Sequence, residues 1–218
     1  MGRSIPVCRA AAARRAGTGF ILGRAFLDGG PGALVLGDNL FFGHSLPDML
    51  ARAVSRQKGA TVFAHHVDDP GRYGVITIND NGRATAIEEK PLQPKSHWAA
   101  TGLYFYDERI CDIAAKVKPS ARGELEITAV NQAYLEMGEL HVERMGRGFV
   151  WLDAGTYDAL LAASNLVQVM EHRQGLSIAA LEEIAYRQGW IDKPALLELA
   201  RKLGQTPYAG YLNRVAED

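Results

Sequence analysis

The sequence has few cysteines, almost no net charge and no long apolar run. Only two of its 218 residues are cysteines, Cys8 and Cys111, and no zinc-ligand spacing surrounds them. No stretch approaches the ~18 consecutive apolar residues of a membrane span. The net charge of −1 gives no electrostatic reason to expect nucleic acid or a membrane as a partner. We therefore expect a globular protein of the reducing cytoplasm.

Acidic residues are absent from the first 27 positions, where five arginines stand among alanines. An arginine-rich, acid-free start is typical of organellar transit peptides, but the serine content and the amphipathic pattern of such peptides are missing. We therefore interpret residues 1–18 as the product of a reading-frame error or of a wrongly assigned start codon. From about residue 19 the composition is that of an ordinary globular chain.

The segment around which the rest is arranged is residues 33–39, ALVLGDN. Four apolar residues followed by Gly, Asp and Asn predict a strand that is buried on both faces and ends in a polar turn. Asp38 then lies at the carboxyl end of a strand, the edge at which open α/β sheets bind ligands. There a carboxylate either holds a hard cation against phosphate oxygens or simply turns the chain.

Apolar periodicity predicts alternating strands and helices downstream. The expected strands are residues 61–65, 73–78, 84–87, 102–106, 140–145 and 149–152, and the expected helices are residues 46–58, 110–117, 125–137 and 156–170. The first strand, helix and following strand form a βαβ unit, which predicts a partly parallel sheet. The turn at residues 79–82 predicts a hairpin, and Thr156 is the expected N-cap of the long helix.

Beyond residue 175 the composition becomes polar and helical, and two helices are expected at residues 184–188 and 195–203. We therefore expect three parts. These are an atypical N-terminus over residues 1–18, an α/β core over residues 19–174, and a helical appendage over residues 175–218 for oligomerisation or regulation.

Four polar motifs lie where strands end or helices begin. They are DPGRYG at residues 69–74, EEKP at 88–91, ARGELEIT at 121–128 and WLDAGT at 151–156. A glycine lets a backbone approach a ligand closely, and an arginine beside a helix N-terminus suits an anion. Taken singly, each motif also has an ordinary interpretation as a turn, a pair of solvated charges or a helix cap.

Together these segments resemble the glucose-1-phosphate thymidylyltransferases from about residue 19 to the C-terminus. The similarity is carried by LVLGDNLFFGH, DDPGRYGV, EEKPLQPKS, ATGLYFYD, PSARGELEIT and WLDAGTYDALLAASN. It implies an α/β, Rossmann-like nucleotidyltransferase fold with a mixed sheet. It also implies a reaction of dTTP with α-D-glucose 1-phosphate that yields dTDP-glucose and pyrophosphate.

The resemblance gives roles to individual residues. Asp38 and Asp153 would hold a catalytic Mg²⁺, and Lys90 would neutralise the sugar phosphate as the third catalytic residue. The substrate pocket would be lined by Tyr73, Gly74, Glu89, Lys90, Thr101, Gly102, Arg122 and Trp151. Metal and cations are needed because the two anionic substrates repel each other and must be held in line.

One departure from the family is large. Its members begin with a strand and a glycine-rich loop, G-x-G-T-R-L-x-P, which wraps the nucleotide phosphates, and no segment here matches that loop. The resemblance therefore indicates an N-terminally truncated member that lacks its first strand. We expect open backbone edges and uncovered apolar helix faces as a result.

Two alternatives to the enzyme remain open. The chain is either the enzyme or a catalytically inactive sugar-phosphate-binding remnant or regulatory subunit. A metal-dependent glycosyltransferase is a further candidate, although EEKP speaks against it. For the enzyme, the resemblance implies a place in dTDP-L-rhamnose and polysaccharide synthesis, small-molecule substrates and a homotetramer.

Overall fold

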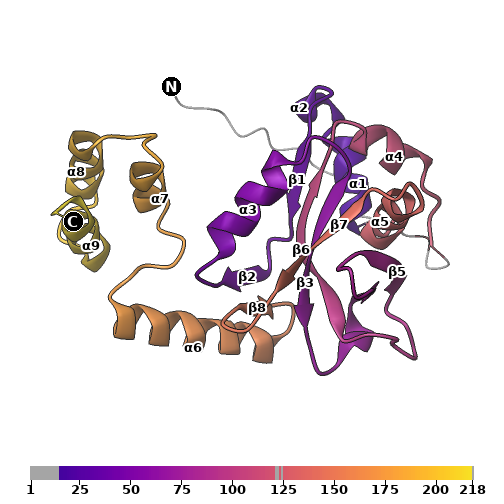
Figure 1. Ribbon diagram of the computed structural model, residues 1–218. Helices are drawn as coiled ribbons and strands as arrows, with labels where there is room; N and C mark the ends of the chain where they lie inside the picture. The colour runs from indigo at the N-terminus through magenta and orange to yellow at the C-terminus, as the bar shows by residue number, and fades with distance from the viewer. Residues whose placement is uncertain (1–14, 121–122, 124, 218) are drawn as a thin grey trace. The chain divides into compact units, whose positions relative to one another are not determined.

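The computed structural model describes residues 15–120, 123 and 125–217, and it divides into two compact units, residues 1–153 and 154–218 (Figure 1). The long helix that begins at Tyr157 belongs to the second unit, although the sequence-based division grouped its residues with the core. The expected three-part division of the chain stays a prediction.

The first unit is built on a mixed sheet of six strands. They are β1 (Gly32–Val35), β3 (Ala60–His66), β4 (Gly74–Ile78), β5 (Ala84–Glu89), β6 (Trp98–Tyr106) and β7 (Leu140–Met145). The order is β5-β4-β6-β3-β7, and β1 also pairs with β6. Among the strands that the structure describes, only β3 and β7 are parallel neighbours; the other pairs are antiparallel. The predicted mixed α/β sheet and the predicted hairpin of β4 and β5 are confirmed.

The predicted βαβ unit is present in a modified form. Strands β1 and β3 are each antiparallel to β6, so they run parallel to each other with β6 between them. The helix that links them is α3 (Leu46–Ser55), within the range expected from the sequence. The crossover therefore passes over one intervening strand. Hydrophobic periodicity does not predict which strands become neighbours in a sheet.

Strand β1 corrects one prediction. The apolar run does form a strand, but it is not buried on both faces, because Val35 is 57% exposed. Within the described residues β1 pairs with β6 alone, and on α3 the side chain of Val54 is 65% exposed. Burial of a strand depends on the neighbours it finds, which its own residues do not specify.

A second, two-stranded sheet pairs β2 (Asn39–Phe42) with β8 (Val150–Asp153). The sequence predicted β8 but treated the start of β2 as a turn. The chain does turn at Gly37 and Asp38, yet it becomes extended again at Asn39. This pairing joins segments more than a hundred residues apart at one edge of the first unit.

Helices cover both faces of the large sheet (Figure 1). The helices described in the first unit are α1 (Arg15–Leu22), α2 (Arg24–Leu27), α3, the short 3₁₀ helix η1 (Pro70–Arg72), α4 (Ile110–Lys116) and α5 (Ile127–Glu136). Side chains of successive β3 residues enter different cores, because neighbours on a strand point to opposite faces. Val62 packs in the core with α1, α4 and α5, whereas Phe63 packs in the core with Met49 of α3.

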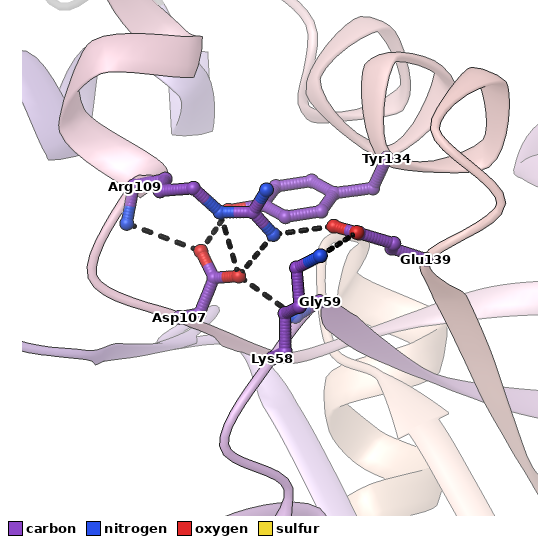
Figure 2. Close-up of polar contacts among 6 residues, drawn as sticks. All are labelled: Lys58, Gly59, Asp107, Arg109, Tyr134 and Glu139. Carbon is purple, nitrogen blue, oxygen red and sulfur yellow. Dashed lines mark hydrogen bonds and ion pairs between the residues drawn. The ribbon is translucent and has the colours of Figure 1, made fainter.

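A polar network fastens the end of the sheet opposite Asp38 (Figure 2). Asp107, which follows β6 and is 5% exposed, accepts hydrogen bonds from the Gly59 N–H at 2.7 Å and the Tyr134 hydroxyl at 2.9 Å. The Arg109 guanidinium contacts both Asp107 and Glu139. Because Gly59 precedes β3 and Glu139 precedes β7, the network joins the ends of three strands to α5.

The second unit is helical. It contains α6 (Tyr157–Gln174), α7 (Leu181–Arg187), α8 (Lys193–Lys202) and α9 (Pro207–Glu217). The predicted N-cap is confirmed, because Thr156 Oγ1 accepts from the Ala159 N–H at 3.2 Å. The sequence predicted α6, α7 and α8 but missed α9, whose Leu212 is fully buried. In the described part of the chain, no helix has the length and apolar character to cross a membrane.

Candidate active site

A cavity of about 360 Å³ opens beside the carboxyl end of β1. Nine of the predicted site residues line it: Asp38, Tyr73, Gly74, Glu89, Lys90, Thr101, Gly102, Trp151 and Asp153. The tenth, Arg122, lies outside the described residues. Tertiary structure thus gathers five separate segments at one cavity, while the roles given to these residues stay predictions.

The two aspartates are brought together by the β2–β8 pair. Asn39 lies opposite Asp153 in the antiparallel register, and Asp38 is the residue before Asn39. Both aspartates line the cavity, and Asp38 is exposed. Across the described residues no group of three or more His, Cys, Asp or Glu side chains gathers as a metal site. Two carboxylates that leave further positions for substrate oxygens fit the way Mg²⁺ binds in phosphate-transfer sites.

Asn39 is the main contact that the sequence-based interpretation missed. Its Oδ1 accepts from the Trp151 indole N–H at 2.7 Å and from the Gly102 N–H at 3.0 Å. Its Nδ2 donates to Asp38 Oδ1 at 2.8 Å. The sequence signal was the asparagine that follows Asp38, but it is equally typical of a turn.

An aromatic cluster forms one wall of the cavity. The rings of Trp151 and Tyr73 have centroids 4.9 Å apart, and His65 meets the indole edge-on at 6.2 Å. Burial, and secondly the neighbouring His66, lower the pKa of His65. The imidazole is therefore a neutral ring at physiological pH. The Arg72 guanidinium lies 5.9 Å from the centre of the Tyr73 ring and brings a cation to the same side.

Gly102 lets the backbone of β6 come close to the β1–β2 turn. A Cβ atom built there would lie 2.5 Å from Asn39 Oδ1 and 2.8 Å from the Leu36 Cβ. Its neighbour Thr101 is fully buried, and its hydroxyl donates to the Phe63 carbonyl at 3.0 Å. The Thr101 hydroxyl is thus already hydrogen-bonded to β3. That Thr101 approaches the sugar stays a prediction.

Glu89 and Lys90 lie where β5 ends. The Thr128 hydroxyl donates to Glu89 Oε2, which orients that carboxylate from the first turn of α5. Lys90 has φ = +45°, in the left-handed region, and its N–H donates to the Tyr73 carbonyl at 3.0 Å. A lysine in this conformation directly before Pro91 is strained, and such strain is concentrated at functional sites.

Other lining residues lay outside the prediction. They are Leu36, Asn39, Arg72, Ala100, Tyr104, Glu126, Ile127 and Thr128. Arg72, Glu126 and Thr128 belong to motifs that the sequence had already marked. Tyr104 lies in the ATGLYFYD segment, but no role was assigned to it from the sequence because it looks like any core aromatic. Its burial, and secondly the charge of Glu89, raise the pKa of its hydroxyl, which therefore stays protonated.

Comparison with known proteins identifies the family. The family model for nucleotidyl transferases matches residues 11–169. The chain belongs to the nucleotidyl transferase family. It is 50% identical over 198 residues to the glucose-1-phosphate thymidylyltransferase of Xanthomonas campestris pv. campestris. It is 51% identical over 196 residues to that of Neisseria meningitidis serogroup A. The predicted membership among the glucose-1-phosphate thymidylyltransferases is confirmed.

These alignments also define how much of a family member the chain represents. They cover 91% and 90% of this chain, and 67% and 68% of the two relatives. The chain thus spans about two thirds of the length of the relatives it matches.

Solved structures agree with this assignment. A crystal structure from Bacillus anthracis, described as a glucose-1-phosphate thymidylyltransferase in complex with sucrose, has a TM-score of 0.64 and 37% identity. The match covers 72% of this chain and 63% of that one. A UDP-glucose pyrophosphorylase complexed with UDP-glucose also has a TM-score of 0.64, at 23% identity over 71% of this chain and 62% of that one. This second likeness shows the fold alone.

Proposed function

We propose that the cavity binds α-D-glucose 1-phosphate and that the activity is the formation of dTDP-glucose and pyrophosphate from dTTP and this sugar phosphate. The observation that carries the proposal is the convergence of Asp38, Glu89, Lys90 and Asp153 on one cavity. The names of the relatives favour this enzyme over an inactive sugar-phosphate-binding remnant.

In this reaction a phosphate oxygen of the sugar phosphate bonds to the α-phosphorus of dTTP. The bond between that phosphorus and the bridging oxygen to the β-phosphate breaks, and pyrophosphate leaves. Both substrates are anions, so positive charge must hold them in line. Lys90 and Arg72 would supply side-chain cations, and Glu89 would accept hydrogen bonds from sugar hydroxyls. Tyr73 and Trp151 would pack against the sugar ring.

A divalent cation is part of the proposal, and we take it to be Mg²⁺. Asp38 and Asp153 would hold it, and when bound it would neutralise phosphate charge and polarise the phosphoryl group. From the resemblance we further propose a cytoplasmic location, a homotetramer and a place in dTDP-L-rhamnose synthesis for polysaccharide. These finer proposals rest on the family, not on the cavity.

The deciding experiment measures pyrophosphate release by the purified 218-residue chain with dTTP, glucose 1-phosphate and Mg²⁺. Asp38→Asn is the test variant, and Asp80→Asn, in the exposed β4–β5 turn, is the matched control. We expect release that is lost in the first variant and kept in the second. A folded chain that binds glucose 1-phosphate without releasing pyrophosphate would favour the binding remnant. Absence of both would contradict the assignment of the cavity.

A further inference from the structure

The Asn39 side chain connects three parts of the cavity wall. Its single oxygen accepts two hydrogen bonds, one from the Trp151 indole on β8 and one from the Gly102 backbone on β6. Its amide nitrogen donates to the carboxylate of Asp38 in the β1–β2 turn. Both acceptor positions of the oxygen are therefore filled, while the nitrogen is directed at a charged group.

This combination of contacts requires an amide. An aspartate would offer the same oxygen but would face Asp38 with a second acceptor, and an aliphatic side chain would offer neither function. The space around Asn39 is also adapted to it, since the Gly102 position has no room for a Cβ atom. Asp38 itself lies exposed in a turn, where a carboxylate without a donor would rotate freely.

We propose that Asn39 is a positioning residue, whose amide holds the Asp38 carboxylate, the Trp151 indole and the β6 backbone in one fixed arrangement. The cation-binding edge and the aromatic wall of the cavity are then a single hydrogen-bonded unit. This inference rests on the proposed function, because that function gives Asp38 and Trp151 their roles. It adds a residue that acts through both of them.

A merely structural role would have a different signature. If Asn39 only fastened β2 to β6, its removal would lower the melting temperature, while the folded variant would keep its cation affinity. A positioning role changes that affinity in protein that is still folded. The fluorescence emission of Trp151 reports on the aromatic wall, because the indole N–H loses its acceptor when the Asn39 side chain is removed.

The experiment uses the full chain with Trp98→Phe and Trp190→Phe, so that Trp151 is the only indole. Neither of the removed indoles lines the cavity. The test variant is Asn39→Ala, with Asn39→Asp to retain the oxygen acceptor. The control is Asn79→Ala, which removes an amide that accepts from the Arg83 N–H in the exposed β4–β5 turn. Mn²⁺ serves as the probe cation, with its free concentration followed by electron paramagnetic resonance.

For Asn39→Ala we expect Mn²⁺ binding about tenfold weaker, the size of one lost hydrogen bond to a charged group. We also expect the fluorescence emission of Trp151 to shift, and acrylamide to quench it more strongly because the indole is more accessible. Asn39→Asp should restore the parent emission, and Asn79→Ala should match the parent in both measurements. Parent-like Mn²⁺ affinity or parent-like emission in folded Asn39→Ala would overturn the inference. If Asn39→Ala does not fold, Asn39→Ser, whose shorter side chain keeps a hydroxyl, takes its place with the same expectations.

The two proposals fail separately. A parent chain that binds neither Mn²⁺ nor glucose 1-phosphate contradicts the proposed function. The emission of Trp151 in Asn39→Ala and its recovery in Asn39→Asp then decide the inference about Asn39, because that readout needs no ligand.

Discussion

Asn39 lies opposite Asp153 in the antiparallel register of β2 and β8. The two residues are 114 positions apart in the sequence. Their pairing places lining residues of the cavity on two adjacent strands, β2 and β8. It brings the turn that carries Asp38 next to the end of β8, and it places the Trp151 indole against the Asn39 amide. A change at this junction is therefore expected to affect both the cation-binding edge and the sugar-phosphate pocket.

Asp153→Asn is expected to lower the rate of pyrophosphate release about a hundredfold or more, which abolishes useful turnover. The reason is that it removes one of the two carboxylates placed for the cation. Glucose 1-phosphate binding should remain largely intact, since the sugar phosphate is held mainly by other side chains. Pyrophosphate release and calorimetric titration measure the two quantities on the same preparation. Undiminished release would refute the metal role of Asp153, and Asp80→Asn serves as the control.

Lys90→Ala is expected to raise the dissociation constant for glucose 1-phosphate about tenfold or more, the typical loss for a hydrogen bond to a charged group. Lys95→Ala is the matched control, because Lys95 is exposed, pairs with Glu88 at 2.9 Å and does not line the cavity. Isothermal titration of each variant with glucose 1-phosphate gives the comparison. An unchanged dissociation constant in Lys90→Ala would contradict the phosphate role.

Gly102→Ala is expected to destabilise the chain by about 1–3 kcal/mol, the usual cost of forcing an extra carbon into a packed site. The new Cβ would meet Asn39 Oδ1 at 2.5 Å, so Asn39 must move and the Trp151 emission should change with it. Gly146→Ala is the control, since a Cβ there meets no atom within 4 Å. Urea denaturation measures the difference, and equal stability of the two variants would show that the approach of β6 to the turn is looser than the structure has it.

Asp107 is expected to make the stability of the first unit dependent on pH. Burial alone would raise the pKa of Asp107, but hydrogen bonds from Arg109, the Gly59 N–H and Tyr134 outweigh it and hold the pKa below its usual value. The ionised carboxylate therefore contributes stability above the pKa of an unfolded aspartate, about 4. That stability is lost as pH falls through the lower pKa of the folded state.

Denaturation in urea from pH 7 to pH 3 tests this expectation. Asp107→Asn should be about 1.5–3 kcal/mol less stable at pH 7, because the hydrogen bonds to a charged group are weakened. The deficit should shrink as pH falls below about 4, because an unfolded aspartate then takes up a proton while the folded carboxylate stays ionised to lower pH. A deficit that stays constant over the whole range would mean that Asp107 acts through packing and not through its charge. Asp112→Asn, on an exposed aspartate of α4 that pairs with Arg24, is the control.

Much of the fold follows from the sequence because the signals for helices and strands are local. The β4–β5 hairpin has its turn residues within a few positions, and the N-cap of α6 is a threonine directly before the helix. The order of the motifs along the chain likewise indicates the family, because each motif is a short contiguous segment. Nine of the predicted site residues could be named in this way, since they occur in segments with a recognisable pattern.

Only the tertiary structure decided how those segments meet. The strand β2 begins with an asparagine that a local pattern assigns to a turn, and it becomes a strand because β8 supplies its partner. Val35 is exposed on β1 because burial depends on which elements lie alongside, not on how apolar the strand is. The three contacts of Asn39 come from segments spread over more than a hundred residues. By itself the sequence determined the chemistry available to this protein, and long-range strand pairing decided its geometry.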